Sequence, residues 1–200
     1  MLDPARSIAL AERVADVARE LGFESALIGA GALAVHRYTR GTEDIDLAVF
    51  VDPGQHLTDL AQRLRDSGLR ATLRLPDDED PLGGVISVHP AREDQDLQDD
   101  LVEVVNFRNP ANPVRNPGPG ALARARPLPD STLRCVTVED LVALKLYAGG
   151  LADHADIVEL LARNPDVDAG QVRAIASPFD TTGVLEGLMK QAAQRGSTPR

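Results

Sequence analysis

Two aspartates open an apolar run, because Asp44-Ile-Asp46 is followed directly by Leu-Ala-Val-Phe-Val at 47–51. Successive side chains of a β-strand point to opposite faces, so carboxylates two residues apart point the same way. Two like charges beside a buried run are unfavourable unless a cation or hydrogen-bond donors compensate them. Mg²⁺ binds carboxylates together with substrate phosphates and is the natural compensator. The simpler alternative is a solvated turn at the edge of a strand.

A glycine turn lies shortly before the aspartate pair. Gly29-Ala30-Gly31 follows the apolar segment 25–28 and precedes helix-forming residues at 32–37. Free backbone N–H groups and a helix N-terminus at such a junction favour an anion such as phosphate. A turn of this kind alone often binds nothing. Together with two carboxylates on the adjacent strand, it predicts a phosphate cradle beside a divalent-metal site, as phosphoryl or nucleotidyl transfer requires.

Composition and charge limit the classes of function. The chain has 200 residues, of which 43% are hydrophobic and 26% charged, as in an ordinary globular protein. Its single Cys135 excludes an internal disulfide and a multi-cysteine zinc site. The net charge of −10, with nine acids and one arginine at 77–100, argues against a protein that coats polyanions. We find no signal peptide and no transmembrane segment, and we expect a cytoplasmic protein without membrane contact.

The elements that must position these groups follow from hydrophobic periodicity and from Gly and Pro breaks. Strands are predicted at 25–28, 45–51, 69–75, 85–88, 101–107 and 133–136, and the acidic stretch before residue 101 is predicted as an exposed hairpin loop. Helices are predicted at 4–21, 32–37, 55–67, 120–126, 141–148, 153–163, 168–176 and 181–194. These elements predict a mixed α/β core at 1–136, a helical C-terminal subdomain at 137–194 and a flexible tail at 195–200.

Two blocks of the sequence resemble the minimal nucleotidyltransferases of the polymerase-beta-like superfamily, and in particular the AbiEii-type toxins and related bacterial proteins. The first block, residues 27–49, contains the glycine turn and then Arg-Gly-Thr-Glu-Asp-Ile-Asp at 40–46, which matches the family pattern Arg-x-Thr-x-Asp-hydrophobic-Asp. The second, residues 138–148, is similar to the family's lysine-bearing helix. An acidic pair, Asp153 and Asp156, follows it as in the family. The resemblance spans most of residues 22–162.

The resemblance implies a role for each matched residue. Asp44 and Asp46 would ligate Mg²⁺, or Mn²⁺, and through the metal the triphosphate. Glu103, on a later strand, is the best match for the family's third carboxylate and would complete the metal site or act as general base. The implied nucleotide-binding residues are Gly29, Ala30, Gly31, Arg40, Thr42 and Lys145.

Simpler interpretations exist for three of these groups. Glu103 fits an exposed strand residue, and Lys145 fits a surface lysine whose stem lies on the protein. Asp153 and Asp156 fit negative charges at a helix N-terminus.

The resemblance further implies the fold and the activity. The fold would be a mixed sheet with flanking helices and a helical C-terminal subdomain. The activity would be Mg²⁺-dependent transfer of a nucleoside monophosphate from an NTP to a hydroxyl of a tRNA, a protein or a small molecule. A cognate antitoxin or a second copy of the chain are the implied protein partners.

Two departures from the family pattern support a different function. The sequence has Gly-Ala where the family usually has Gly-Ser or Gly-Gly, and it has Glu103 in place of an aspartate. The alternative is therefore a catalytically lapsed relative that binds a nucleotide or a partner, such as a toxin–antitoxin component.

Overall fold

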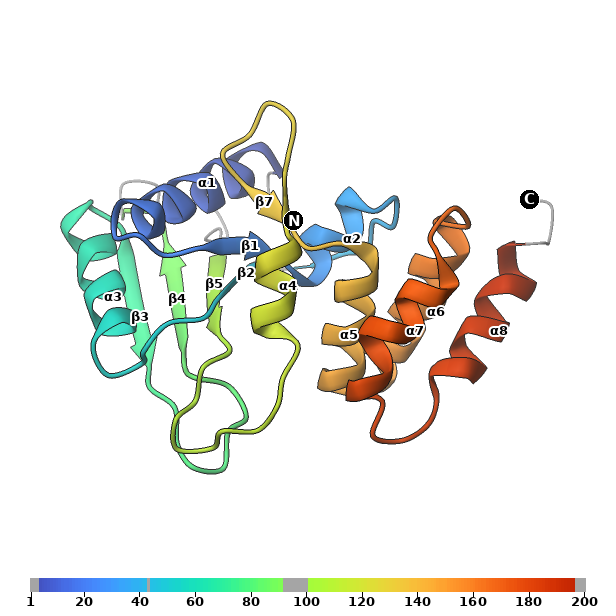
Figure 1. Cartoon of the computed structure of the whole chain (residues 1–200). Helices are drawn as coiled ribbons and strands as arrows, with labels where there is room; N and C mark the ends of the chain where they lie inside the picture. Colours follow the sequence, from blue (N-terminus) through green and yellow to red (C-terminus); the bar gives the residue numbers. More distant parts are fainter. Residues whose placement is uncertain (1–3, 43, 92–100, 197–200) are drawn as a thin grey trace.

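The computed structural model describes residues 4–42, 44–91 and 101–196. Seven strands of these residues form one mixed sheet in the order β3-β4-β5-β2-β1-β7-β6, as Figure 1 shows in part. The strands are β1 (Ser25–Leu27), β2 (Asp44–Val49), β3 (Arg70–Arg74), β4 (Val85–His89), β5 (Leu101–Asn106), β6 (Arg126–Pro127) and β7 (Arg134–Cys135). The helices are α1 (Pro4–Glu20), α2 (Gly29–Val35), α3 (His56–Asp66), α4 (Gly118–Arg124), α5 (Val138–Ala148), α6 (Leu151–Arg163), α7 (Ala169–Ala176) and α8 (Leu185–Gly196).

Strand β2 lies in the middle of the sheet and sets the geometry of the predicted site. It is antiparallel to β1 and parallel to β5, and its residues pair with β5 so that Asp46 lies opposite Glu103. Directly paired residues of neighbouring strands place their side chains on the same face. The register therefore brings a carboxylate from β5 beside those of β2.

The core consists mainly of Ala, Val, Leu and Ile side chains, since the chain has only four Phe, two Tyr and no Trp. Helix α3 shows the pattern clearly, because its apolar stripe of Leu57, Leu60, Ala61 and Leu64 is fully buried. Helices α1 and α3 contact each other and pack on the sheet, while α4 packs on β2 (Figure 1). This packing fixes the sheet and leaves the start of β2 near the C-terminal helices.

Helices α5–α8 group beside the sheet, and we call them the C-terminal helical region (Figure 1). The hydroxyl Oγ1 of Thr137 caps α5 by accepting a hydrogen bond from the backbone N–H of Asp140. The carboxylate of Asp140 is fully buried and binds Arg124 of α4 at 2.6 Å. Gly149 ends α5 in the left-handed conformation, with φ of 69°. The helical region is therefore tied to the core through α4.

The structure differs from the sequence-based expectation at a few boundaries. The glycine turn is itself the first turn of α2, which was predicted to begin only at residue 32. Helix α8 begins at residue 185 rather than 181 and continues to 196, so it includes the first two residues of the predicted tail. The rest of that tail, 197–200, lies outside the described residues.

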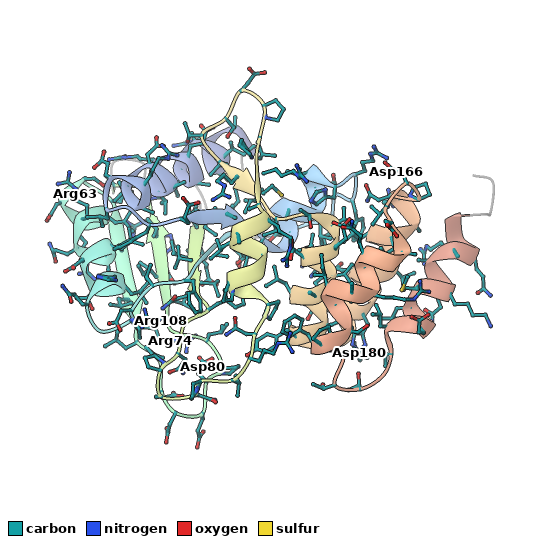
Figure 2. All side chains as sticks on the ribbon, viewed as in Figure 1. Arg63, Arg74, Asp80, Arg108, Asp166 and Asp180 are labelled. Carbon is teal, nitrogen blue, oxygen red and sulfur yellow. The ribbon has the colours of Figure 1, made fainter. Side chains whose placement is uncertain are left out.

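The hairpin loop predicted between β4 and β5 lies largely outside the described residues, which exclude 92–100. The two strands that flank this loop pair in antiparallel fashion, as a hairpin requires. The acids at 77–80 lie instead in the loop between β3 and β4, where Asp80 forms an ion pair with Arg74 at 2.8 Å (Figure 2). Within the described parts of the chain, every helix is too short or too polar to cross a bilayer.

Candidate active site

Three carboxylates meet on the sheet, and they are the three that the family resemblance implies. Asp44 and Asp46 come from β2 and Glu103 from β5, and one oxygen of each lies within 4.8 Å of the others. All three side chains are partly buried. We call these residues the acidic triad. Among the described residues, none of the ion pairs includes a member of the triad.

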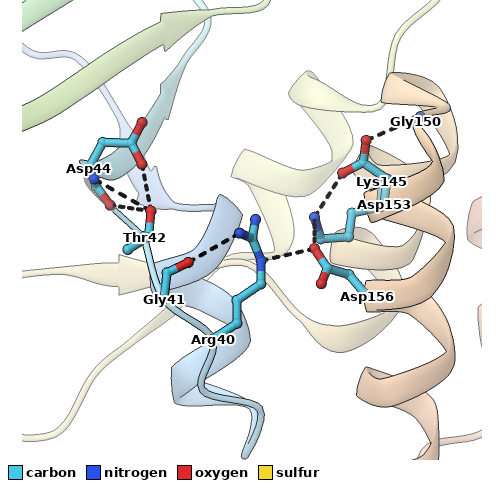
Figure 3. Close-up of polar contacts among 8 residues, drawn as sticks. All are labelled: Arg40, Gly41, Thr42, Asp44, Lys145, Gly150, Asp153 and Asp156. Carbon is cyan, nitrogen blue, oxygen red and sulfur yellow. Dashed lines mark hydrogen bonds and ion pairs between the residues drawn. The ribbon is translucent and has the colours of Figure 1, made fainter.

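Neighbouring hydroxyl groups hold two of the three carboxylates. Thr42 Oγ1 donates a hydrogen bond to Asp44 Oδ1 at 2.6 Å and lies 3.4 Å from the Asp44 backbone N–H, which donates to it (Figure 3). Ser87 Oγ on β4 donates to Glu103 Oε1 at 3.4 Å. Thr42 therefore serves to orient Asp44 in this structure, and its contact with a nucleotide stays a prediction.

Asp46 is the most perturbed member of the triad. Burial raises its pKa from 3.8 to about 7, and repulsion from Asp44 and Glu103 adds to the rise. Lys145 and Arg40 act in the opposite direction and lower the pKa of Asp46. These two cations therefore lie close enough to act electrostatically on the triad.

The backbone conformation and the surroundings of residue 29 require a glycine at the start of α2. Its φ of +56° is left-handed, and a Cβ at this position would overlap the carboxylate of Asp46. The backbone at residue 29 therefore lies closer to the triad than it could if this residue had a Cβ atom. The first amides of a helix, here those of Gly29, Ala30 and Gly31, have no carbonyl partner within the helix. They are suited to bind an anion beside the triad.

The residues of the triad fit a divalent metal ion. Carboxylate oxygens are the ligands that Mg²⁺ and Mn²⁺ prefer, and three of them converge within 4.8 Å. Burial raises the pKa of Asp46 and the like charges of Asp44 and Glu103 raise it further, so a bound cation would favour the ionised carboxylate. Asp44, Asp46 and Glu103 are therefore the residues that would hold the ion.

A second cluster of charges joins the core to the C-terminal helical region (Figure 3). Lys145 Nζ of α5 lies 2.9 Å from Asp153 Oδ1 and 2.7 Å from Asp156 Oδ2, both of α6. Arg40, in the loop between α2 and β2, places Nε 3.2 Å from the same Asp156 Oδ2. Asp156 Oδ2 has no hydrogen-bond partner among the described residues, and its contacts with Lys145 and Arg40 are ion pairs. We call these four residues the bridging cluster.

Burial decides between the interpretations that the sequence left open for this cluster. The side chain of Lys145 is 7% exposed and that of Asp156 is 4% exposed, so neither is a surface charge. Asp153 is in the first turn of α6, and it accepts a hydrogen bond from the N–H of Gly150 at 3.2 Å. The helix-terminal interpretation therefore holds for Asp153 and is wrong for Asp156.

Sequence reasoning noted Asp156 but did not place it in the site. The signal was available in the periodicity of α6, because Asp156 lies in the same buried stripe as Ile157 and Leu160. A carboxylate in an apolar stripe requires a partner, since an unpaired buried charge is unfavourable. The residues that supply the partners were not visible from the helix alone.

The matching family and the arrangement of charges agree. The family described as "Nucleotidyl transferase AbiEii toxin, Type IV TA system" matches residues 9–176, which contain both charge clusters. No curated protein matches the chain.

Solved structures show the same fold. An antigenic nucleotidyltransferase-like protein from Paracoccidioides brasiliensis has a TM-score of 0.56 at 17% identity, over 95% of this chain and 94% of that one. ANT(2'')-Ia, in complex with adenylyl-2''-tobramycin, has a TM-score of 0.54 at 16% identity, over 87% of this chain and 97% of that one. MenT4, a nucleotidyltransferase toxin from Mycobacterium tuberculosis H37Rv, has a TM-score of 0.51 at 14% identity, over 98% of this chain and 68% of that one.

Proposed function

The chain belongs to the AbiEii family of nucleotidyltransferase toxins, and from this premise we propose that it transfers a nucleoside monophosphate from an NTP to an acceptor hydroxyl with the help of Mg²⁺. The observation that carries the proposal is the convergence of Asp44, Asp46 and Glu103 within 4.8 Å, beside the glycine turn of α2. Carboxylates next to free backbone amides are the groups that a metal-bound triphosphate requires.

Each group has a defined task in this proposal. Asp44 and Asp46 hold the metal ion, and the amides at the start of α2 bind phosphate oxygens. When bound, Mg²⁺ supplies the positive charge that neutralises the triphosphate and stabilises the departing pyrophosphate. Lys145 adds positive charge from α5, and Arg40 adds it from the loop between α2 and β2. Catalysis then rests mostly on positioning and on charge neutralisation.

The reaction forms one bond and breaks another. The oxygen of the acceptor hydroxyl attacks the α-phosphorus, and the bond from that phosphorus to the bridging oxygen of the β-phosphate breaks. Pyrophosphate leaves with the electron pair of the broken bond. In this proposal Glu103 accepts the proton of the attacking hydroxyl, or completes the metal site through its carboxylate.

The family implies an acceptor and a protein partner for the chain, without identifying either molecule. The acceptor is a tRNA, a protein or a small molecule, and a cognate antitoxin is the partner that a toxin of this family implies. A homodimer is the alternative assembly. Cytoplasmic location stays a prediction from the sequence.

A transfer assay tests the proposal directly. The full chain is incubated with Mg²⁺, each NTP labelled at the α-phosphate, and either total tRNA, a mixture of proteins or small hydroxylated acceptors. We expect label on one class of acceptor only when Mg²⁺ is present. A γ-labelled NTP is the matched control and should leave no label, because the γ-phosphate departs in pyrophosphate.

A second candidate function rests on two specific residues. Ala30 is buried and offers no hydroxyl where the family often has serine, and Glu103 replaces the family's aspartate. A chain with these changes could retain nucleotide binding and lose turnover. Mg²⁺–NTP binding by calorimetry, with no transfer of label to any acceptor class, would favour this lapsed relative over the enzyme.

A further inference from the structure

The buried carboxylate of Asp156 contacts cations from two separate parts of the fold. Lys145 reaches it from α5 at 2.7 Å, and Arg40 reaches it from the core at 3.2 Å. Tyr38 is also within electrostatic range of this carboxylate, since burial raises the pKa of Tyr38 and the negative charges of Asp156 and Glu159 raise it further. Asp156 is thus the point at which the core, α5 and α6 meet electrostatically (Figure 3).

Lys145 and Arg40 have more N–H donors than these contacts use. A lysine ammonium has three N–H donors; in Lys145 the hydrogen bond to Asp153 uses one, and the ion pair with Asp156 uses at most a second. Arg40 has five donors and uses Nε toward Asp156 and Nη1 toward the carbonyl of Gly41 at 3.4 Å. Each cation therefore keeps at least one donor for a further anion.

The positive charges of both cations act on the triad. Both Lys145 and Arg40 lower the pKa of Asp46, which places their charges within electrostatic reach of its carboxylate. A long, flexible lysine without a partner would sample many rotamers, and fixing it during binding would lower the affinity. Contact with a buried carboxylate removes this freedom before the ligand arrives.

We infer that Asp156 is a positioning residue, which holds Lys145 and Arg40 so that their remaining donors bind the phosphates of the nucleotide. The inference rests on the proposed function, because it assigns the nucleotide to the triad. Asp156 itself does not touch the nucleotide. Asp153 assists with Lys145 alone, since its side chain is 26% exposed and contacts only one of the two cations.

The alternative is that Asp156 serves stability only, as Asp140 does with Arg124. The two roles differ in what they do to binding. A positioning role affects the triphosphate far more than the nucleoside, because only the triphosphate uses the held cations. A purely structural role affects both ligands equally or affects neither.

Calorimetry with the α,β-methylene analogue of an NTP, in Mg²⁺, separates these roles. We expect Asp156→Asn to weaken binding of the analogue at least about tenfold and to leave nucleoside binding nearly unchanged. Asp156→Glu keeps the charge and moves it by one methylene group, so it should fold and still weaken the analogue about threefold to tenfold. Unchanged affinity for the analogue in Asp156→Glu overturns the inference even where Asp156→Asn does not fold.

Glu159 provides the matched control. It lies one turn further along α6, and its carboxylate also has two cationic partners, Arg163 at 3.1 Å and Arg195 at 2.5 Å. Glu159→Gln should change affinity for the analogue less than about twofold. An equal loss in Glu159→Gln and Asp156→Asn would assign both residues to the packing of α6 and contradict the inference.

A second readout is independent of the nucleotide. A held ammonium exchanges its protons slowly, so the Lys145 Nζ resonance should be visible by NMR in the wild type and in Glu159→Gln, and lost in Asp156→Asn. If the wild type binds no Mg²⁺–NTP while the resonance still depends on Asp156, the proposed function fails and the holding contact stands. If the analogue binds and the resonance is unaffected by Asp156→Asn, the inference fails and the proposed function stands.

Discussion

The acidic triad and the bridging cluster lie close together but differ in charge balance. The triad has three carboxylates and no ion pair among the described residues, whereas the bridging cluster has two carboxylates and two cations in direct contact. Arg40 lies between Asp44 and the helical part of the cluster (Figure 3). One cluster is therefore neutralised by the protein, and the other still carries unbalanced negative charge.

This difference separates two kinds of charged site. A balanced buried cluster adds rigidity, and removal of one member leaves its partner buried and unpaired. An unbalanced cluster opposes folding of the metal-free protein, and a bound cation relieves the repulsion. The same kind of substitution should therefore have opposite effects on stability in the two clusters.

The largest effect is expected from Asp44→Asn combined with Asp46→Asn. The double variant should lose Mg²⁺-dependent NTP binding by at least about a hundredfold, because two of the three proposed metal ligands lose their charge. In the absence of metal it should be more stable than the wild type, since the repulsion in the triad is removed. Calorimetry measures the affinity for Mg²⁺–NTP, and urea unfolding measures the stability of the metal-free protein. An unchanged affinity for Mg²⁺–NTP would show that the metal does not bind at the triad.

Lys145→Ala tests the balanced cluster. From the sequence alone we expect little change in stability and a loss of NTP affinity of about 1–3 kcal/mol, as for a charge-assisted hydrogen bond. The structure corrects the first expectation, because Asp156 would be left buried with one cation fewer. We now expect the free energy of unfolding to fall by about 3–5 kcal/mol. Urea unfolding measures this loss, and a stable Lys145→Ala variant would contradict the balanced cluster.

The pH dependence of stability isolates Asp46. Its folded-state pKa of about 7 lies above the ordinary value of 3.8, so the folded protein binds more protons between these values. The contribution of Asp46 to stability is therefore full at low pH, falls as the pH rises from about 4 to about 7, and is constant above. We expect a fall of about 1–3 kcal/mol, discounted for partial exposure.

The control for the pH experiment is Asp46→Asn without metal. Subtraction of its pH profile from that of the wild type removes the contribution of every other titrating group. The difference between the two free energies of unfolding should develop between about pH 4 and pH 7. A difference that is flat over this range would show that the pKa of Asp46 is ordinary.

The smallest effect is expected from Gly29→Ala. Alanine at a left-handed φ is unfavourable by about 1–2 kcal/mol, and its Cβ would push the carboxylate of Asp46 aside. Thermal unfolding should show this loss of stability, and calorimetry should show weaker Mg²⁺–NTP binding. Gly22→Ala is the matched control, because Gly22 also has a positive φ but open space around its Cβ position. Equal effects on binding would place the glycine turn outside the site.

The sequence predicts the triad better than the bridging cluster, for a physical reason. The alternation of side chains along β2 places Asp44 and Asp46 on one face, which is a local property of the strand. Glu103 was identified as the third member through the resemblance to the family. Only the register between β2 and β5, which tertiary packing sets, was needed to bring Glu103 opposite Asp46.

The bridging cluster depends on contacts that no local pattern encodes. Asp156 and Arg40 are far apart in the sequence, and their contact follows from how α6 packs beside the loop after α2. Periodicity predicts that position 156 faces inward but does not identify its partners. The predicted start of α2, at residue 32, is wrong for another reason. Glycine usually disfavours a helix, and yet α2 begins at Gly29.

The most direct test of the metal site is a crystal soaked with Mn²⁺ and a non-hydrolysable triphosphate analogue. We expect an anomalous peak in contact with the carboxylates of Asp44 and Asp46, at ligand distances of roughly 2.1 Å as for an octahedral Mg²⁺-type site. The triphosphate should bind the same ion and approach the amides at the start of α2. A bound analogue with no metal at the triad, or a metal held by other residues, would contradict the account.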